Sequence, residues 1–443
     1  MILERNEYNT CYRTSDYERR GPSSMSSISD ARDPFEKDYG RIVHSAAFRR
    51  LQAKTQVIGL DVGDIHRTRL THSMEVAQIA RGIVIHLNEN HAVFQEKQSL
   101  DASLVEAAAL AHDLGHPPFG HHGEYALHEC MKPYGGFEGN AQTFRILTRL
   151  EGDKKLGLNP TRGLLMSILK YPILLNKAMA DATDPAQTQH PPKASAYQSD
   201  QEAFDWMLAP LTTEERAHLT HTKELPNGYL KTVHKPLECS IIELADDIAY
   251  ATHDLEDAIN LGFLRVDELV DLVQVFLKYN KEPALQQAIY NLKQLESDRD
   301  SLKYQLNRVF GAIISTFIHS LEVHQLFFAD QTPSMRISHT VLMPSDLQAI
   351  LERFSQVVME RVIHSQKVQM VAFKGQRMIH QLFEAMMNNH LLLSENDRIL
   401  YQQVSSDSDR ARVVCDYIAG MTDSFATKMH ARLFGHSRSF FDH

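Results

Sequence analysis

The chain has 443 residues, enough to bury a large core, and its formal net charge of −10 opposes an overall electrostatic attraction to nucleic acid. No apolar run approaches the length that spans a bilayer, and residues 1–20 lack the apolar segment of a secretion signal. We therefore expect a cytoplasmic protein with no membrane contact, in which nucleic acid would need a local basic patch.

Composition predicts an all-α fold. Apolar residues make up 43% of the chain, whereas its 20 Gly and 16 Pro are few for this length, and no strand-like alternation stands out. The four Cys are scattered without paired spacing, which predicts free thiols in a reducing compartment rather than a zinc ribbon. The 24 His favour imidazole and carboxylate ligands for any metal, which suit Mn, Fe, Co, Ni or Mg.

Three regions are expected along the chain. Residues 1–38 predict a loose N-terminal arm, because segment 21–29 is rich in Ser and poor in apolar side chains. Residues 39–265 are expected to form the core domain, with a Pro-containing insertion near 181–235. Residues 266–443 show recurrent helical periodicity without a fixed repeat, which predicts a helical C-terminal region packed on that core.

Two helices are predicted in the first part of the core. Segment 39–57 fits a helix that carries several cations, and segment 71–87 places apolar residues at helical spacing. His72 lies on the apolar stripe of the second helix, where a His is usually a satisfied core residue and an unpaired polar group is penalised. Arg69 lies one turn before His72, and its planar guanidinium suits a phosphate.

The densest run of ligand-type side chains is His112-Asp113-Leu-Gly-His-Pro-Pro-Phe-Gly-His-His-Gly-Glu124. The preceding apolar stretch 104–111 predicts a buried helix that ends in the His-Asp pair, and Gly115 then stops it. A buried carboxylate requires a counter-cation or a metal ion. The dipeptide alone leaves two interpretations open, a metal site or an Asp that orients a core His.

His121 and Glu124 follow directly after this pair. Their spacing of three residues allows a hydrogen-bonded acid/base pair. The alternative is a loop His beside a Glu that the N-terminal dipole of a helix stabilises. The Gly- and Pro-rich turn before them would carry both side chains back toward ligands fixed on the helices.

A long helix is predicted over 237–261, and it carries an unusual line of polar residues. Asp246, Tyr250 and Asp254 are spaced by four residues, so they stack along one line away from the apolar stripe. Stacked carboxylates repel each other unless a cation or a hydrogen-bonding ligand lies against them, although an acidic face exposed to solvent is the usual explanation. One of these Asp residues with two His and a second Asp would form a mononuclear metal site with positions open for water and substrate.

Several long motifs occur in one order along most of the chain. They are segments 41–57, 67–76 (Arg-Thr-Arg-Leu-Thr-His-Ser-Met-Glu-Val), 112–124, 137–142 (Phe-Glu-Gly-Asn-Ala-Gln), 243–250 (Glu-Leu-Ala-Asp-Asp-Ile-Ala-Tyr) and 416–423. In these motifs the sequence resembles the bacterial HD-domain deoxynucleoside triphosphate triphosphohydrolases, the dGTPase-like family. The resemblance implies an HD-domain helical fold with a helical C-terminal extension.

The resemblance also implies roles for individual residues. The ligands of a divalent metal carry over to His72, His112, Asp113 and Asp246. Catalytic roles carry over to His121 and Glu124, and His116 is expected near the phosphates. Asp246 is preferred to Asp247 as the ligand, because it gives the Asp, Tyr, Asp spacing of the family.

The remaining implied contacts concern the nucleotide. Gln52 and Asp254 match positions that contact the sugar 3′-hydroxyl, and Tyr250 matches one that packs where a 2′-hydroxyl would clash. Arg69 is expected to neutralise charge on the polyphosphate. Ser424 departs from the pattern, because a basic residue is expected after Met-Thr-Asp.

The implied activity is hydrolysis of a dNTP, either dGTP or several dNTPs, to deoxynucleoside and inorganic triphosphate by attack of water on the α-phosphorus. One alternative is an HD phosphohydrolase acting on another nucleotide. A second is a regulator that binds nucleotide or single-stranded DNA through the basic segments 41–54 and 432–438. The resemblance also suggests a homo-oligomer, a hexamer or a dimer-based assembly, with single-stranded DNA or a dNTP as activator.

Overall fold

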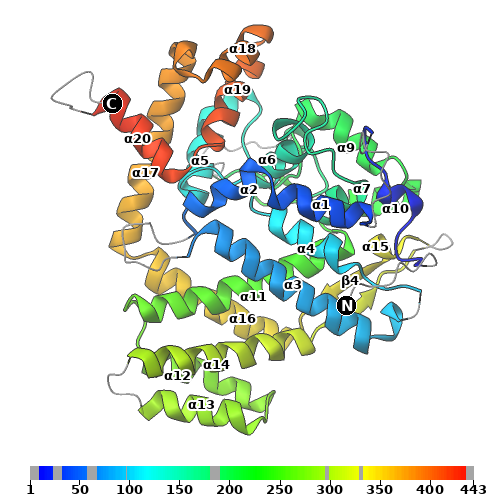
Figure 1. The fold of residues 1–443 in the computed structure, drawn as a ribbon, viewed down its shortest axis with the longest axis vertical. Coiled ribbons are helices and arrows are strands. Elements are labelled where there is room, and N and C mark those ends of the chain that lie inside the picture. The colour runs from blue at the N-terminus through cyan, green and yellow to red at the C-terminus, as the bar shows by residue number, and fades with distance from the viewer. Residues whose placement is uncertain are drawn as a thin grey trace.

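The computed structural model describes residues 9–22, 32–56, 67–95, 97–179, 190–294, 299–328 and 333–435. Helices dominate this part of the chain, and the strands form two antiparallel sheets of two strands each (Figure 1). The all-α prediction is therefore confirmed. None of the described helices is both long and apolar enough to cross a membrane.

The α-helices up to the long central helix are α1 (Pro34–Val43), α2 (Ala46–Arg50), α3 (Arg69–Asn90), α4 (Ala102–Ala111), α5 (Gly120–Met131), α6 (Gly139–Arg145), α7 (Arg162–Ser167), α8 (Leu175–Ala178), α9 (Gln201–Leu208), α10 (Thr213–Leu219) and α11 (Leu237–Asn260). Those that follow are α12 (Val266–Val273), α13 (Pro283–Gln294), α14 (Arg299–His319), α15 (Met335–Ser338), α16 (Ser345–Val358), α17 (Gln366–Asn388), α18 (Glu395–Gln403), α19 (Asp407–Ala419) and α20 (Asp423–Phe434). The strands are β1 (Thr222–Glu224) paired with β2 (Leu230–Thr232), and β3 (Glu322–Gln325) paired with β4 (His339–Leu342).

Three helices form the centre of the core. Helices α3, α4 and α11 pack against one another, and each buries an apolar face in the same large cluster. The Thr68 hydroxyl caps α3 by accepting a hydrogen bond from the Thr71 amide, and the Asp101 carboxylate caps α4 in the same way. Because the three buried faces meet, polar residues beside them are brought to one place.

The N-terminal segment differs from the expected loose arm. In its described parts Cys11, Tyr12 and Phe35 are buried in the main core. Asp16 is also buried, and it accepts a hydrogen bond of 2.7 Å from Arg336 Nη1, far along the chain. A few aromatic contacts and buried ion pairs therefore fix a segment whose composition is mostly polar. Residues 1–8 and 23–31 lie outside the described residues.

The helix expected over 39–57 is interrupted. Helix α1 ends at Val43, and α2 begins after Ser45, whose hydroxyl accepts a hydrogen bond from the Phe48 amide. Ser at an N-cap satisfies a free amide, so the chain begins a new helix in a new direction. Position 57 lies outside the described residues.

The segment expected as an insertion near 181–235 is folded where it is described. From residue 190 onward it contains α9, α10, β1 and β2, and it buries Phe204, Met207 and Leu219 in the main core. The Pro residues that suggested a loop lie mostly before α9, so they do not interrupt its packing. Residues 180–189 lie outside the described residues.

The C-terminal helices pack on both ends of the core. Helices α12, α13, α14 and α16 contribute to the main apolar cluster, whereas α17, α19 and α20 form a second cluster with α5 and α6 (Figure 1). At the start of α20 the Asp423 carboxylate accepts hydrogen bonds from the Phe119 amide at 3.0 Å and the Thr55 amide at 2.9 Å. The C-terminal region therefore holds the turn that precedes α5.

Candidate active site

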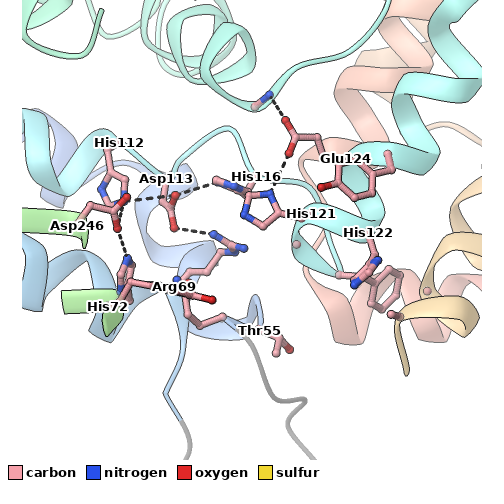
Figure 2. Close-up of a pocket in the computed structure, with 18 of the residues that line it drawn as sticks. Thr55, Arg69, His72, His112, Asp113, His116, His121, His122, Glu124 and Asp246 are labelled. Carbon is pink, nitrogen blue, oxygen red and sulfur yellow. Dashed lines mark hydrogen bonds and ion pairs between the residues drawn. The ribbon is translucent and has the colours of Figure 1, made fainter. Parts of the chain in front are cut away.

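A cavity of about 1340 Å³ lies where α3, α4, α5 and α11 face α17 and α20. Its lining includes most of the site residues expected from the sequence, as the close-up in Figure 2 illustrates. They are Arg69, His72, His112, Asp113, His116, His121, Glu124, Asp246 and Tyr250. This cavity and the densest sequence motif therefore coincide, as is typical of an active site.

Four of these residues form a compact His/Asp cluster. His72 comes from α3, His112 and Asp113 follow the end of α4, and Asp246 comes from α11. His72 Nε2 lies 2.9 Å from Asp246 Oδ1, and His112 Nε2 lies 3.4 Å from Asp113 Oδ1 and 3.8 Å from Asp246 Oδ1. The ligand atoms of His72, His112 and Asp113 all lie within 4.8 Å of one another. This cluster could bind a metal ion.

The imidazole of His112 is prepared to act as a metal ligand. Its Nδ1 lies 2.6 Å from the Ala109 carbonyl oxygen, so it carries the proton and donates it there. Nε2 then keeps its lone pair, is buried, and has no hydrogen-bond partner among the described residues. A buried imidazole nitrogen that faces two carboxylates without a hydrogen bond fits an N/O metal site.

Both carboxylates of the cluster are charged. Burial alone would raise the pKa of Asp113, but His116, His112 and Arg69 outweigh it and hold that pKa well below its usual range. Burial alone would also raise the pKa of Asp246, but the hydrogen bond with His72 lowers that pKa. The cluster therefore presents two anionic carboxylates and two imidazoles, a donor set that suits a divalent cation.

Two basic side chains contact Asp113 from the side opposite the cluster (Figure 2). Arg69 Nη1 donates a hydrogen bond of 2.6 Å to Asp113 Oδ2, and His116 Nδ1 lies 2.9 Å from Asp113 Oδ1. Burial, reinforced by the Arg69 charge, lowers the pKa of His116 to about 4, so its imidazole is neutral at pH 7. Arg69 lines the cavity as expected, but its guanidinium already forms an ion pair with Asp113.

His121 and Glu124 form the pair that their spacing allowed. Glu124 is buried on α5, and its carboxylate accepts hydrogen bonds from His121 Nδ1 at 3.1 Å and the Gly139 amide at 2.9 Å. Burial alone would raise the pKa of Glu124, but Lys193 and His121 lower it, so the carboxylate is charged. The side chain of His121 is 62% exposed, which leaves Nε2 accessible in the cavity. This pair can exchange a proton with a bound molecule.

Glycines let the turn before this pair pass close to its neighbours. A Cβ on Gly115 would lie 2.0 Å from the Gly139 carbonyl oxygen, which is impossible without moving α6. Gly120 has a φ of +59°, and a Cβ there would lie 2.9 Å from Arg69 Nη2. Phe119 also has a positive φ, and the bond from its amide to Asp423 holds it there. The turn therefore brings α5 against the His/Asp cluster.

Two expected sugar contacts do not line this cavity. Gln52 is exposed, and Gln56 lines the cavity instead. Asp254 is buried, and burial raises its pKa well above the usual range despite the charge of Arg67. A helix rises 1.5 Å per residue, so eight residues place Asp254 about 12 Å from Asp246 along α11. Tyr250, one turn from Asp246, does line the cavity.

Sequence reasoning missed several cavity residues. Lys193 Nζ lies 3.9 Å from Glu124 Oε1 and 3.6 Å from Glu138 Oε1, although its segment was interpreted as an insertion. Lys170 Nζ lies 3.5 Å from Glu243 Oε1 on the other side of the cavity. Neither Lys belongs to a motif with characteristic spacing, so only the fold brings them here.

Comparison with known proteins agrees with this geometry. An HD domain model matches residues 69–251, and a phosphohydrolase-associated domain model matches residues 341–432. The chain is 39% identical to a deoxyguanosinetriphosphate triphosphohydrolase-like protein of Vibrio parahaemolyticus over 91% of this chain and 94% of the relative. A protein of the same name from Shewanella pealeana is 39% identical over 94% of this chain and 95% of the relative.

HD domains are metal-dependent hydrolases, and the His/Asp cluster lies within the matched region. The similarity to these relatives extends over nearly the whole chain, so it includes the C-terminal helices. The chain is therefore a hydrolase that belongs to the deoxyguanosinetriphosphate triphosphohydrolase-like family of HD-domain proteins.

Proposed function

We propose that this protein is a metal-dependent triphosphohydrolase that converts a dNTP and water into a deoxynucleoside and inorganic triphosphate. The observation that carries the proposal is that one cavity holds both the His/Asp cluster and the His121–Glu124 pair. His116 lies between them, 2.9 Å from Asp113 through Nδ1 and with its ring 5.1 Å from that of His121. Metal ligands and a proton-exchanging pair can thus act on one phosphorus atom.

The metal ligands in this proposal are His72, His112, Asp113 and Asp246. A divalent ion bound there, whether Mn, Mg, Co, Ni or Fe, would polarise a phosphoryl oxygen and lower the pKa of a bound water. Asp113 orients the neighbouring groups, because Arg69 and His116 both contact its carboxylate. Arg69 then neutralises charge on the α-phosphate side of the polyphosphate, and His116 lies beside it on the same carboxylate of Asp113.

His121 is proposed to exchange the proton of the reaction. Glu124 accepts a hydrogen bond from His121 Nδ1, which fixes the ring and leaves Nε2 for the attacking water or the leaving 5′-oxygen. The charged Glu124 also stabilises the imidazolium form when His121 takes up a proton. Exposure of His121 within the cavity supports this role.

Tyr250 is proposed to exclude a 2′-hydroxyl. It lines the cavity one turn after Asp246, which supports a contact with a sugar whose α-phosphate would face the cluster. We expect Tyr250→Ala to raise kcat/KM for a ribonucleotide relative to its deoxynucleotide by about tenfold or more. Tyr250→Phe keeps the ring and should keep the discrimination. Equal discrimination by the Ala variant and the natural protein would refute this role.

The experiment that tests the function is a substrate panel. Purified protein loaded with Mn²⁺, Mg²⁺ or Co²⁺ is incubated with each dNTP, alone and in mixtures, and inorganic triphosphate is quantified by anion exchange. We expect triphosphate from dGTP, which the names of the relatives favour, or from several dNTPs. Activity only on a nucleoside monophosphate or cyclic nucleotide would instead support a different HD phosphohydrolase.

A homo-oligomer is also proposed. Helix α17 exposes apolar side chains, with Met370 60% and Phe373 63% accessible in the single chain. Such side chains on one helix are common at subunit contacts. Light scattering after size exclusion, with and without a dNTP or single-stranded DNA, measures the assembly and whether either proposed activator changes it.

A further inference from the structure

The wall of the cavity formed by the C-terminal region is basic. Arg and Lys side chains that line the cavity come from both of its sides: Arg69, Lys170, Lys193, Lys367, Lys374 and Lys428. The first three belong to the HD domain region, whereas Lys367 and Lys374 come from α17 and Lys428 comes from α20. The two groups differ in whether their charges are already paired.

The cations of the HD side are all paired with carboxylates. Arg69 contacts Asp113 at 2.6 Å, Lys170 lies 3.5 Å from Glu243, and Lys193 lies 3.9 Å from Glu124. By contrast, Lys367, Lys374 and Lys428 are exposed, and none of them forms an ion pair with another described residue. The uncompensated positive charge of the described cavity wall therefore lies on α17 and α20.

Two contacts hold this basic wall against the turn before His121. Gly375 packs on the Phe119 ring so closely that a Cβ there would lie 2.7 Å from Phe119 Cγ, and Lys374 is its chain neighbour. Asp423 accepts the hydrogen bond from the Phe119 amide, and Ser424 is the next residue. Positions 374 and 424 therefore lie beside the same turn, one from each helix.

The start of α20 lacks a basic side chain that the resemblance to the dGTPase-like family implies. A basic residue is expected after Met-Thr-Asp, but Ser424 occupies that position and lines the cavity. Lys428 lies four residues later on α20, which places it one turn along the same helix face, and it also lines the cavity. A cation that is missing at one turn is thus present at the next.

We propose that Lys374 and Lys428 bind the β- and γ-phosphates of the substrate, and that Lys428 supplies the charge that Ser424 lacks. This inference rests on the proposed function, because it assigns the polyphosphate end of the same substrate. A triphosphate carries several negative charges, and Lys binds phosphate as a compact point charge. The α-phosphate would face the His/Asp cluster, and the other two phosphates would extend toward α17 and α20.

The first test measures KM and kcat separately. We expect Lys374→Met and Lys428→Met each to raise KM for the dNTP about fivefold, as is usual for the loss of one exposed charge contact, with kcat within twofold. Arg377→Met is the matched control, because Arg377 is also an exposed cation of α17 but does not line the cavity. Unchanged KM in both Lys variants, or a loss in kcat alone, would overturn the assignment.

The second test restores a cation at position 424 in a variant that lacks the one at position 428. In the Lys428→Met background, Ser424→Arg should return KM to within about twofold of the natural protein, because it places a guanidinium one turn earlier on the same helix face. If Lys428→Met raises KM and Ser424→Arg restores none of the loss, the relation between positions 424 and 428 is wrong. Melting temperatures of all variants confirm that they are folded.

Direct binding separates this inference from the proposed function. Calorimetry with inorganic triphosphate and metal-loaded protein should show binding that the double variant Lys374→Met and Lys428→Met weakens at least tenfold. If the natural protein releases no triphosphate from any dNTP, yet binds triphosphate through these Lys residues, the function fails and the anion site stands. If it hydrolyses dNTPs and the double variant binds triphosphate equally well, the anion site fails alone.

Discussion

His121→Ala is expected to lower kcat for dNTP hydrolysis at least ~100-fold while the protein keeps its metal ion. The variant removes the side chain that holds an accessible Nε2 in the cavity and donates Nδ1–H to buried Glu124. It leaves untouched the four residues of the His/Asp cluster. Steady-state kinetics and metal analysis by mass spectrometry measure the two effects on the same preparation.

His122→Ala is the control for this prediction. His122 follows His121 on α5 and also lines the cavity, but it forms no hydrogen bond or ion pair with Glu124 or the described residues of the His/Asp cluster. It should keep the metal ion and most of kcat. Loss of metal from His121→Ala would contradict the assignment, because ligand atoms of His116, His121 and Glu124 also lie within 4.8 Å of one another and would then be a metal site themselves.

His112→Ala is expected to lose the bound metal ion and, with it, more than ~100-fold in triphosphate release. His112 Nε2 faces two charged carboxylates without a hydrogen bond, whereas its Nδ1 is committed to the Ala109 carbonyl. The double variant His112→Ala and Asp113→Ala should show the same loss. The single variant is the cleaner test, because it leaves Arg69 paired with Asp113.

Neighbouring carboxylates provide the control. Asp246→Asn should lose metal as His112→Ala does, whereas Asp247→Asn should retain it, since only Asp246 contacts His72 and His112. Asp247 lines the cavity, and burial beside Asp246 raises its pKa to about 7. Triphosphate release by metal-free His112→Ala at the rate of the natural protein would contradict the assignment of the His/Asp cluster as the metal site.

The sequence was sufficient to predict the framework of the site. The apolar periodicity around His72 and the apolar run before His112 predict two buried helices. Both are present, as α3 and α4. The spacing of Asp246 and Tyr250 predicts that they share one face of α11, and both residues line the cavity. These predictions succeed because a buried helix fixes the direction of each side chain through its period of 3.6 residues.

Contacts between distant segments were not predictable in the same way. The ion pair of Arg69 with Asp113 and the approach of Lys193 to Glu124 depend on loops whose path no local pattern encodes. Asp254 failed to reach the cavity because residues on one face of a helix still separate along its axis. In the N-terminal segment, the burial of Asp16 depends on an ion pair with Arg336. The two residues are so far apart in the sequence that no local pattern predicts this pair.

The C-terminal region acts on the site through few residues. Asp423 holds both Phe119 and Thr55, and the buried Lys54 Nζ donates hydrogen bonds to the His116 and Ala419 carbonyl oxygens. The turn that carries His121 is thus fixed by Asp423 of the C-terminal matched region and by Lys54, which precedes the HD domain match. These contacts explain why the similarity to the family includes helices far from the His/Asp motif.

Hydrolysis of a dNTP in water enriched in ¹⁸O, followed by ³¹P NMR of the phosphate product and mass spectrometry of the nucleoside product, tests the central claim most directly. Attack of water on the α-phosphorus with departure of the 5′-oxygen predicts inorganic triphosphate with one ¹⁸O on a terminal phosphorus, and an unlabelled deoxynucleoside. Neither product should form after the metal is removed with a chelator. Formation of a deoxynucleoside monophosphate with pyrophosphate, or ¹⁸O in the deoxynucleoside, would contradict the proposed reaction.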